Sequence, residues 1–368
     1  QPAIINNRGL FARNLKTTGY RLAIENTDGT KQYAQGPNID EFVSHEVLTL
    51  GDTTDKRSLS LPIAETPEPE WGDPADWVNV ATFTAKPVEI TRPDGKVVKA
   101  NDWSTALQQA IDSGARTVYF PHRTQGTITL LSDVIVRGNV ERIIGLESEF
   151  RGIYGPLDTG HKLSIIARND KPLVIERWDA TYTGIQFRHE GQAPLVLRHL
   201  SMNEYNGVTK AAGSGDLFIE DFAFGGGLFI EGGNVWARQY NPEGEALKSK
   251  TDNNGGNLWV LGLKTEGDTQ LVNTRHGGQT EIVGGFIYAN KANDPDKVMF
   301  RVDATSAMSF TIGEWVGRKQ PFDIIERTDT GARLKFGQAP GRGEGSMVPL
   351  FVTRPARPIA TPMPPTSP

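Results

Sequence analysis

The stretch GGNLWVLGLKTEGDTQ, residues 255–270, starts with two glycines, continues as a short apolar strand and ends in a turn that carries Glu266 and Asp268. The same glycine-bounded strand occurs upstream as GGNVWARQY, residues 232–240, and downstream as GGQTEIVGG, residues 277–285. Successive copies are therefore shifted by 23 and then by 22 residues. A repeat of this length indicates a unit that cannot bury its own apolar face and must stack on its neighbours.

The content of the repeat decides between the stacked architectures. Each unit holds two or three short strands and lacks a helical pattern, whereas a propeller blade would need a longer repeat with four strands. The 40 glycines and 23 prolines also favour short strands and many turns. We therefore predict an all-β chain folded as a right-handed parallel β-helix.

One helix is expected near residues 102–113. Asp102 can cap its start, and Gly114 can end it. Its apolar residues follow helical spacing: Trp103, Ala106, Leu107, Ala110 and Ile111. Because the open end of a β-helix exposes unpaired backbone, we expect this helix to cover such an end.

The chain divides at changes in composition. Short strands at residues 1–60 are interpreted as the terminal turns of a first β-helix. Residues 61–100 start with a segment rich in proline and acidic residues, and they predict an extended linker. Residues 101–340 are assigned to a second, longer β-helix with its capping helix, and residues 341–368 to a proline-rich tail.

Composition also excludes several classes of function. The net charge of −5 comes without a basic run, so nucleic acid is not an expected partner. No apolar run of about 18 residues occurs, so no membrane span is expected. The chain has no cysteine, and its six histidines are scattered, which argues against a zinc site or another bound metal. No cofactor is expected.

The segment DWSTALQQAID at residues 102–112, followed by VYFP at 118–121 and by Ile144-Gly145, resembles the pectate-lyase-3-like β-helix superfamily. The layout of two coils and a linker is similar to the C-terminal half of family 55 glycoside hydrolases, which are β-1,3-glucanases. The resemblance implies an extracellular or cell-surface protein directed at a polysaccharide. It also implies a partner, either the missing N-terminal half of a longer precursor or a second copy through self-association.

Glycoside hydrolysis needs two carboxyl groups beside the scissile bond, one of them protonated. Glu266 and Asp268 are the candidate catalytic pair, and stacking of the turns adds further carboxylates as candidates: Glu243, Glu245 and Asp303. Solvated turns accept acidic residues freely, so a purely structural role is the alternative. The position where the family 55 resemblance implies the general acid is occupied by Asn290, which cannot deliver a proton.

A sugar-binding face is predicted on the preceding copy of the repeat. Strand alternation places Trp236, Arg238 and Tyr240 on one outward face, where they could contact a sugar or an acidic glycan. In the alternative, Trp236 and Trp259 stack on each other and pack under a loop. A lyase that uses Lys264 or Arg275 as its base is a further possibility.

These observations predict an extracellular, carbohydrate-directed β-helix whose leading function is polysaccharide hydrolysis. The alternative is a non-catalytic glycan-binding, adhesive or structural β-helix. The position of the acids decides between them, because an enzyme should present two carboxyl groups from different turns on one surface.

Overall fold

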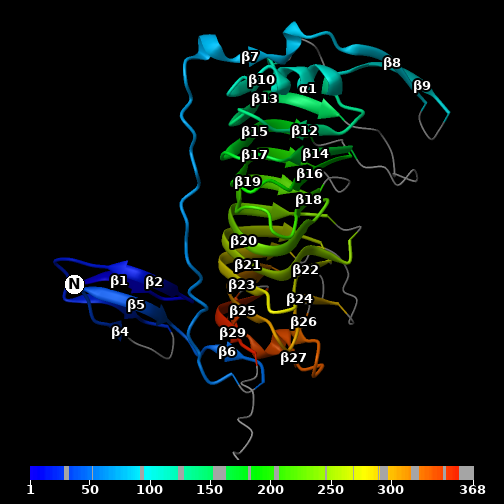
Figure 1. Ribbon diagram of the computed structural model, residues 1–368. Coiled ribbons are helices and arrows are strands. Elements are labelled where there is room, and N and C mark those ends of the chain that lie inside the picture. The colour runs from blue at the N-terminus through cyan, green and yellow to red at the C-terminus, as the bar shows by residue number, and fades with distance from the viewer. Residues whose placement is uncertain are drawn as a thin grey trace, which may run out of the picture.

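The computed structural model describes residues 1–28, 33–51, 53–91, 95–122, 128–151, 163–180, 184–202, 207–244, 247–267, 269–288, 290, 297–315, 323–342 and 345–355. Most of them form a parallel β-solenoid of about 12 turns, as the repeat predicted (Figure 1). No helix within these ranges is long and apolar enough to cross a membrane.

The N-terminal residues form two small sheets beside the solenoid (Figure 1). Their strands are β1 (Pro2–Asn6), β2 (Phe11–Lys16), β3 (Leu22–Asn26), β4 (Tyr33–Ala34) and β5 (Asn38–Val43). Strand β1 pairs in parallel with β3, whereas β3–β4 and β2–β5 are antiparallel. That these residues end a first β-helix stays a prediction.

An extended segment then runs along one side of the solenoid, from its C-terminal end to its N-terminal end (Figure 1). Short elements surround this segment: β6 (Leu48–Thr49), the 3-10 helices η1 (Pro74–Asp76) and η2 (Val80–Thr82), β7 (Val78–Asn79), β8 (Lys86–Thr91) and β9 (Val97–Asp102). Residues 58–71, which lie against the solenoid, are called the strap below. The predicted linker is thus extended in its first part, while β8 and β9 form an antiparallel hairpin.

The one α-helix within the described residues, α1 (Ser104–Asp112), covers the N-terminal end of the coil (Figure 1). All five apolar residues predicted for its inner face are buried in the main core. The carboxylate of Asp102 accepts a hydrogen bond from the backbone N–H of Ser104 at 2.9 Å, so it stabilises the start of the helix as expected.

The coil itself is built from strands that stack turn upon turn. Its first strands are β10 (Thr117–Tyr119), β11 (Ile128–Thr129), β12 (Val134–Val136), β13 (Arg142–Arg151), β14 (Leu163–Ala167), β15 (Leu173–Ala180), β16 (Ile185–His189), β17 (Leu195–Met202), β18 (Gly207–Lys210) and β19 (Leu217–Phe224). The next are β20 (Leu228–Pro242), β21 (Ser249–Glu266), β22 (Gln270–Arg275), β23 (Gln279–Tyr288), β24 (Val298–Val302), β25 (Ala307–Trp315) and β26 (Asp323–Arg327). Parallel pairing joins each strand to the corresponding strand of the next turn.

The C-terminal end is closed by antiparallel pairing of the last strands. These elements are β27 (Arg333–Leu334), η3 (Phe336–Gln338), β28 (Gly341–Arg342) and β29 (Gly345–Thr353). Strand β29 pairs with β25 and also with β6, so the end of the coil has no open edge there. Residues 341–353, assigned to the tail from its proline content, thus include two strands, because their own apolar positions pack on the last turn.

Apolar side chains fill the interior in columns that join paired positions of successive turns, 18 to 23 residues apart. One column joins five successive turns: Leu173, Leu195, Leu217, Val235 and Leu258. All of these side chains are buried, and each such burial contributes about 1.5–3 kcal/mol to folding. The glycine-rich start of the repeat carries a second column, in which the side chains of Asn234, Asn257 and Gln279 hydrogen-bond across the turns.

The turns that contain β13, β15, β17, β19, β20, β21 and β23 bend at residues with a left-handed backbone. The positions include Asp221, Gln239 and Gly262, with φ of 48°, 52° and 74°. The bend reverses the alternation of side chains. As a result, Ala237 and Tyr240 both point into the core although they are three residues apart. The same reversal after Gly262 places Leu263 inside.

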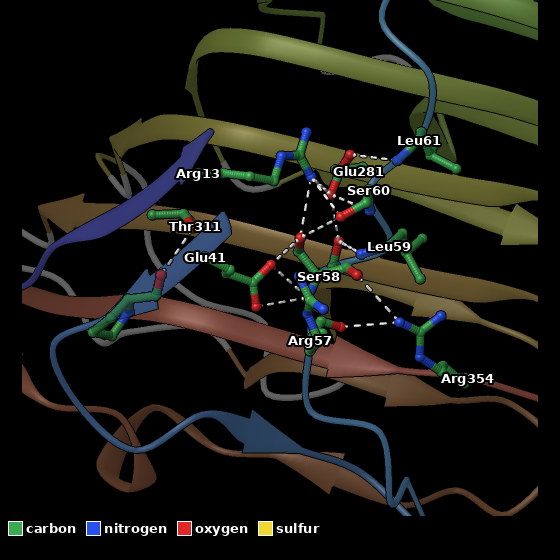
Figure 2. Close-up of polar contacts among 12 residues, drawn as sticks. Arg13, Glu41, Arg57, Ser58, Leu59, Ser60, Leu61, Glu281, Thr311 and Arg354 are labelled. Atoms are coloured by element: carbon green, nitrogen blue, oxygen red, sulfur yellow. Dashed lines mark hydrogen bonds and ion pairs between the residues drawn. The ribbon is translucent and has the colours of Figure 1, made fainter. Parts of the chain in front are cut away.

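The N-terminal unit and the strap are fixed to the solenoid by buried polar contacts (Figure 2). Arg13 of β2 forms an ion pair with the buried Glu281 of β23 at 2.6 Å. Glu281 also accepts hydrogen bonds from the backbone N–H groups of Ser60 and Leu61, at 3.0 and 2.9 Å. Ser58 donates its hydroxyl hydrogen to Glu41 of β5 at 2.5 Å. One carboxylate of the coil thus binds both the unit and the strap.

Candidate functional site

The predicted catalytic residue Glu266 lies at the end of β21, past the bend at Gly262. Side chains of Lys264 and Glu266 both point outward, and each is about two-fifths exposed. Nζ of Lys264 lies 2.5 Å from the Glu266 carboxylate and also contacts the carboxylate of Glu243, which follows β20 on the preceding turn. Two carboxyl groups from neighbouring turns therefore converge on one ammonium group.

The surroundings of Glu266 favour its charged form. The hydrogen bond from Lys264 holds the pKa of the Glu266 carboxyl below its ordinary value of 4.5. A second hydrogen bond comes from the side-chain amide of Asn290 at 3.0 Å. Asn290 also accepts the backbone N–H of Gly267 at 3.1 Å, so it fixes the end of the strand. Glu266 is thus an ionised carboxylate at neutral pH and is unsuited to act as a proton donor there.

Aromatic rings continue the surface on the next two turns. In the strand register, Glu266 pairs with Tyr288 of β23, and Tyr288 pairs with Trp315 of β25. The ring centroids of Tyr288 and Trp315 are 5.2 Å apart, and Phe286 lies 4.9 Å from Tyr288. Trp315 is 37% exposed, which is high for a tryptophan. Its ring is available for stacking on another flat apolar surface.

We call this surface the acid–aromatic ridge; it consists of Glu243, Lys264, Glu266, Phe286, Tyr288 and Trp315. Charged side chains occupy its first two turns and aromatic rings the following two. An apolar ring with polar groups beside it is the combination that recognises a sugar, which has both an apolar face and hydroxyl groups.

The predicted sugar-binding residues lie elsewhere. Trp236 does point outward, but the strap covers it: its indole N–H donates to the carbonyl of Pro62 at 2.8 Å, and only 7% of the residue is exposed. Arg238 donates to the strap carbonyl of Ala64 at 2.7 Å. Both residues therefore bind the chain itself.

The placement of Tyr240 on the outward face is wrong. The left-handed residue Gln239 reverses the alternation, so Tyr240 points into the core. Its hydroxyl contacts that of Thr251 at 2.6 Å, and burial raises the pKa of Tyr240 well above its ordinary value. The alternative interpretation of the tryptophans is confirmed in part: Trp236 and Trp259 occupy one buried cluster under Leu61 of the strap, and the ring stacked on Trp236 is that of Phe218.

Of the other candidate acids, Glu243 contacts the ammonium group of Lys264 beside Glu266, and Asp303 lies at a separate turn. Asp268 and Glu245 lie outside the described residues. Asp303 accepts hydrogen bonds from the backbone of His276 and Thr305, where it supports a turn. Arg275, a possible lyase base, is held by a bidentate contact with Asp252.

Sequence reasoning missed the aromatic half of the ridge. Tyr288 follows Glu266 by 22 residues, so the repeat length alone could have placed it beside Glu266. Trp315 is 27 residues further on, because the register shifts between Val283 and Phe286 and an insertion separates β23 from β25. That irregularity hides Trp315 from a search with a fixed period.

No protein-family model matches the sequence, and a search of curated proteins gives no match. The strand pairing establishes the fold as a parallel β-solenoid, and any finer classification is a proposal.

Proposed function

We propose that the protein binds a polysaccharide strand across the acid–aromatic ridge. One observation carries the proposal: Glu266, Tyr288 and Trp315 are register neighbours on three successive turns and all lie on the outer surface. Successive turns are spaced by about 4.8 Å. An extended glycan that lies across the turns would pack sugar rings on the aromatic side chains and bring its hydroxyl groups to the charged ones.

Hydrolysis of the bound glycan is the second candidate function, and the paired carboxylates favour it. Glu243 and Glu266 come from different turns and contact the same ammonium group. A close pair of carboxyl groups suits a retaining mechanism, in which one carboxylate attacks the sugar and the other carboxyl protonates the leaving oxygen. The ionised Glu266 would be the nucleophile, and Glu243 would have to supply the proton.

The biological setting belongs to the same proposal. The similarity to the C-terminal half of family 55 glycoside hydrolases supports an extracellular or cell-surface location. It also supports a partner that completes the surface, either a preceding β-helix or a second copy of this chain.

Binding to soluble β-glucans and uronate polysaccharides tests the primary proposal. Wild-type protein should be retarded in affinity electrophoresis by at least one glycan, and Trp315→Ala should lose most of the retardation. Tyr20→Ala removes an exposed ring on the N-terminal unit and should behave as wild type. Equal retardation of wild type and Trp315→Ala would place binding away from the ridge.

The same incubations separate binding from hydrolysis. New oligosaccharides that disappear with Glu266→Gln would establish a hydrolase whose nucleophile lies on the ridge. Retention of the glycan without any product would establish a binding protein.

A further inference from the structure

A depression in the surface, called the lateral groove below, lies along β20, β21, β22, β24 and β26, on another side of the coil from the ridge. Its volume is about 650 Å³. Strand β21 contributes to both surfaces, since its first residues line this lateral groove and its last residues belong to the ridge. None of the six ridge residues lines the lateral groove.

The two carboxylates of the lateral groove are already neutralised by the protein. Asp252 accepts a bidentate contact from Arg275, with Nη2 at 2.8 Å. Although partial burial opposes it, this contact lowers the pKa of the Asp252 carboxyl from its ordinary value of 3.8. Glu326 is held by Arg333 at 2.6 Å. Both acids are therefore paired with cations of the chain, so they leave little negative charge for a ligand.

Within the described residues, the remaining cations of the lateral groove are held less closely. Nε of Arg301 is 3.8 Å from Glu326, is buried, and makes no hydrogen bond within the described part of the chain. Lys248 forms no ion pair with any described carboxylate, although it also lines the groove. The lateral groove thus presents Lys248, which has no ion pair within the described residues, and Arg301, whose ion pair with Glu326 is long and whose Nε lacks a hydrogen bond. A buried donor without a partner is costly unless a ligand supplies the acceptor.

The other lining groups indicate what carries the negative charge. Phe229 and Leu247 supply apolar surface, and Asn273 supplies a side-chain carbonyl, since its amide nitrogen is used by Asp252 at 2.8 Å. An inorganic anion would use only the cations. A sugar acid would use all of these groups, because it combines a ring with an apolar face, several hydroxyl groups and one anionic group.

We propose that the lateral groove binds an acidic saccharide, with its carboxylate or sulfate oxygens accepting hydrogen bonds from Arg301 and Lys248. The sugar ring packs on Phe229, and its hydroxyl groups face Asn273. This site is separate from the ridge and does not depend on the function proposed there.

Titration calorimetry with defined oligosaccharides tests the proposal. The probes are a galacturonate hexamer, a neutral glucose hexamer and sodium sulfate, each at low salt. We expect the galacturonate hexamer to bind, the neutral hexamer not to bind, and sulfate to compete only at much higher concentration. Raising the salt concentration should weaken binding, because the cations are partly exposed to solvent.

Variants of the two cations make the test specific. Arg301→Gln and Lys248→Met should each weaken binding of the galacturonate hexamer by about tenfold or more, as expected for loss of a charged hydrogen bond. Lys248→Met removes a side chain that forms no ion pair within the described residues, so it keeps the test valid even if the Arg301 variant folds poorly. Lys99→Met, which removes an exposed cation on the β8–β9 hairpin, is the matched control and should leave this affinity unchanged.

Three results would overturn the proposal: no binding of galacturonate to wild type, equal binding of the neutral hexamer, or an unchanged affinity in Lys248→Met. Loss of binding in Trp315→Ala alone would assign the acidic glycan to the ridge and would likewise overturn it. Failure of the ridge proposal gives a different pattern, because Trp315→Ala then changes the retention of no glycan.

Discussion

Two sets of outward aromatic side chains lie on the same coil and have opposite surroundings. Trp236 and Trp259 are covered by the strap and are 7% and 4% exposed. Tyr288 and Trp315 occupy later turns, beyond the bend, and Trp315 remains 37% exposed. The strands that present them are similar, so what covers the surface decides the role. A ring under the strap contributes to stability, and a ring on the open ridge is available to a ligand.

Truncation of the covered tryptophan should have the largest effect. Trp236→Ala leaves a cavity beneath the strap and removes the hydrogen bond to Pro62, so we expect it to reduce the free energy of unfolding by about 3–5 kcal/mol. Trp315→Ala should reduce it by less than about 1 kcal/mol. Denaturant unfolding of both variants measures the difference, and equal losses would show that exposure does not separate the two sets.

The second-largest loss of stability is expected from a substitution that releases the strap. Glu281→Gln leaves the charge of Arg13 buried without its partner, and we expect a loss of about 3 kcal/mol in the free energy of unfolding. The fluorescence of Trp236 and Trp259 should also shift to the red as water reaches them. Glu89→Gln, on the exposed hairpin, is the control and should change stability by less than about 0.5 kcal/mol. An unchanged emission spectrum in Glu281→Gln would mean that the apolar contacts of Leu61 hold the strap alone.

The repeat in the sequence was sufficient for the coil but not for these two surfaces. The spacing of Gly232, Gly255 and Gly277 sets the register of the turns, because stacking must bring equivalent residues together. Simple alternation fails past each bend, since one left-handed residue moves Tyr240 inside. Gln239 gives no warning of this, because residues other than glycine adopt that conformation rarely.

The strap could not be placed from sequence either. Prolines predicted an extended conformation for it, and the structure agrees, but they do not indicate which face of the coil it covers. That choice depends on contacts over long sequence separation, such as those of Glu68 with Arg142 and Arg198. Strand alternation alone therefore predicts an open face for Trp236, whereas the strap covers it.

The strand that presents Trp315 on the ridge also carries a buried carboxyl group, and the pH dependence of stability can detect it. Glu314 lies between Gly313 and Trp315 in β25 and is fully buried, and burial raises its pKa from 4.5 to about 7. The native state therefore binds more protons than the unfolded state between these values. Stability should fall by about 3 kcal/mol as the pH rises from 4.5 to 7.

Unfolding of Glu314→Gln across this pH range checks the assignment, and the variant should lose that part of the pH dependence. His189, buried in β16, acts with the opposite sign, because burial lowers its pKa from 6.5 to about 4. Its contribution is complete above pH 6.5 and is lost as the pH falls to 4. Unfolding of His189→Gln across the same pH range therefore separates the contribution of His189 from that of Glu314. An unchanged pH profile in Glu314→Gln would show that its carboxyl is charged in the folded protein.

The smallest effect on stability is expected on the ridge itself, where it carries the most information about function. Lys264→Met removes an exposed ion pair, so the free energy of unfolding should change by less than about 1 kcal/mol. The pKa of Glu266 should rise toward 4.5, because the hydrogen bond from Lys264 is the main cause of its lowering. Carboxyl NMR titration measures this pKa, with Glu266→Gln to assign the signal and Lys99→Met as the control. If the pKa of Glu266 does not move, Lys264 is not the main cause of its lowering, and the hydrogen bond from Asn290 and the charge of Lys250 account for it instead.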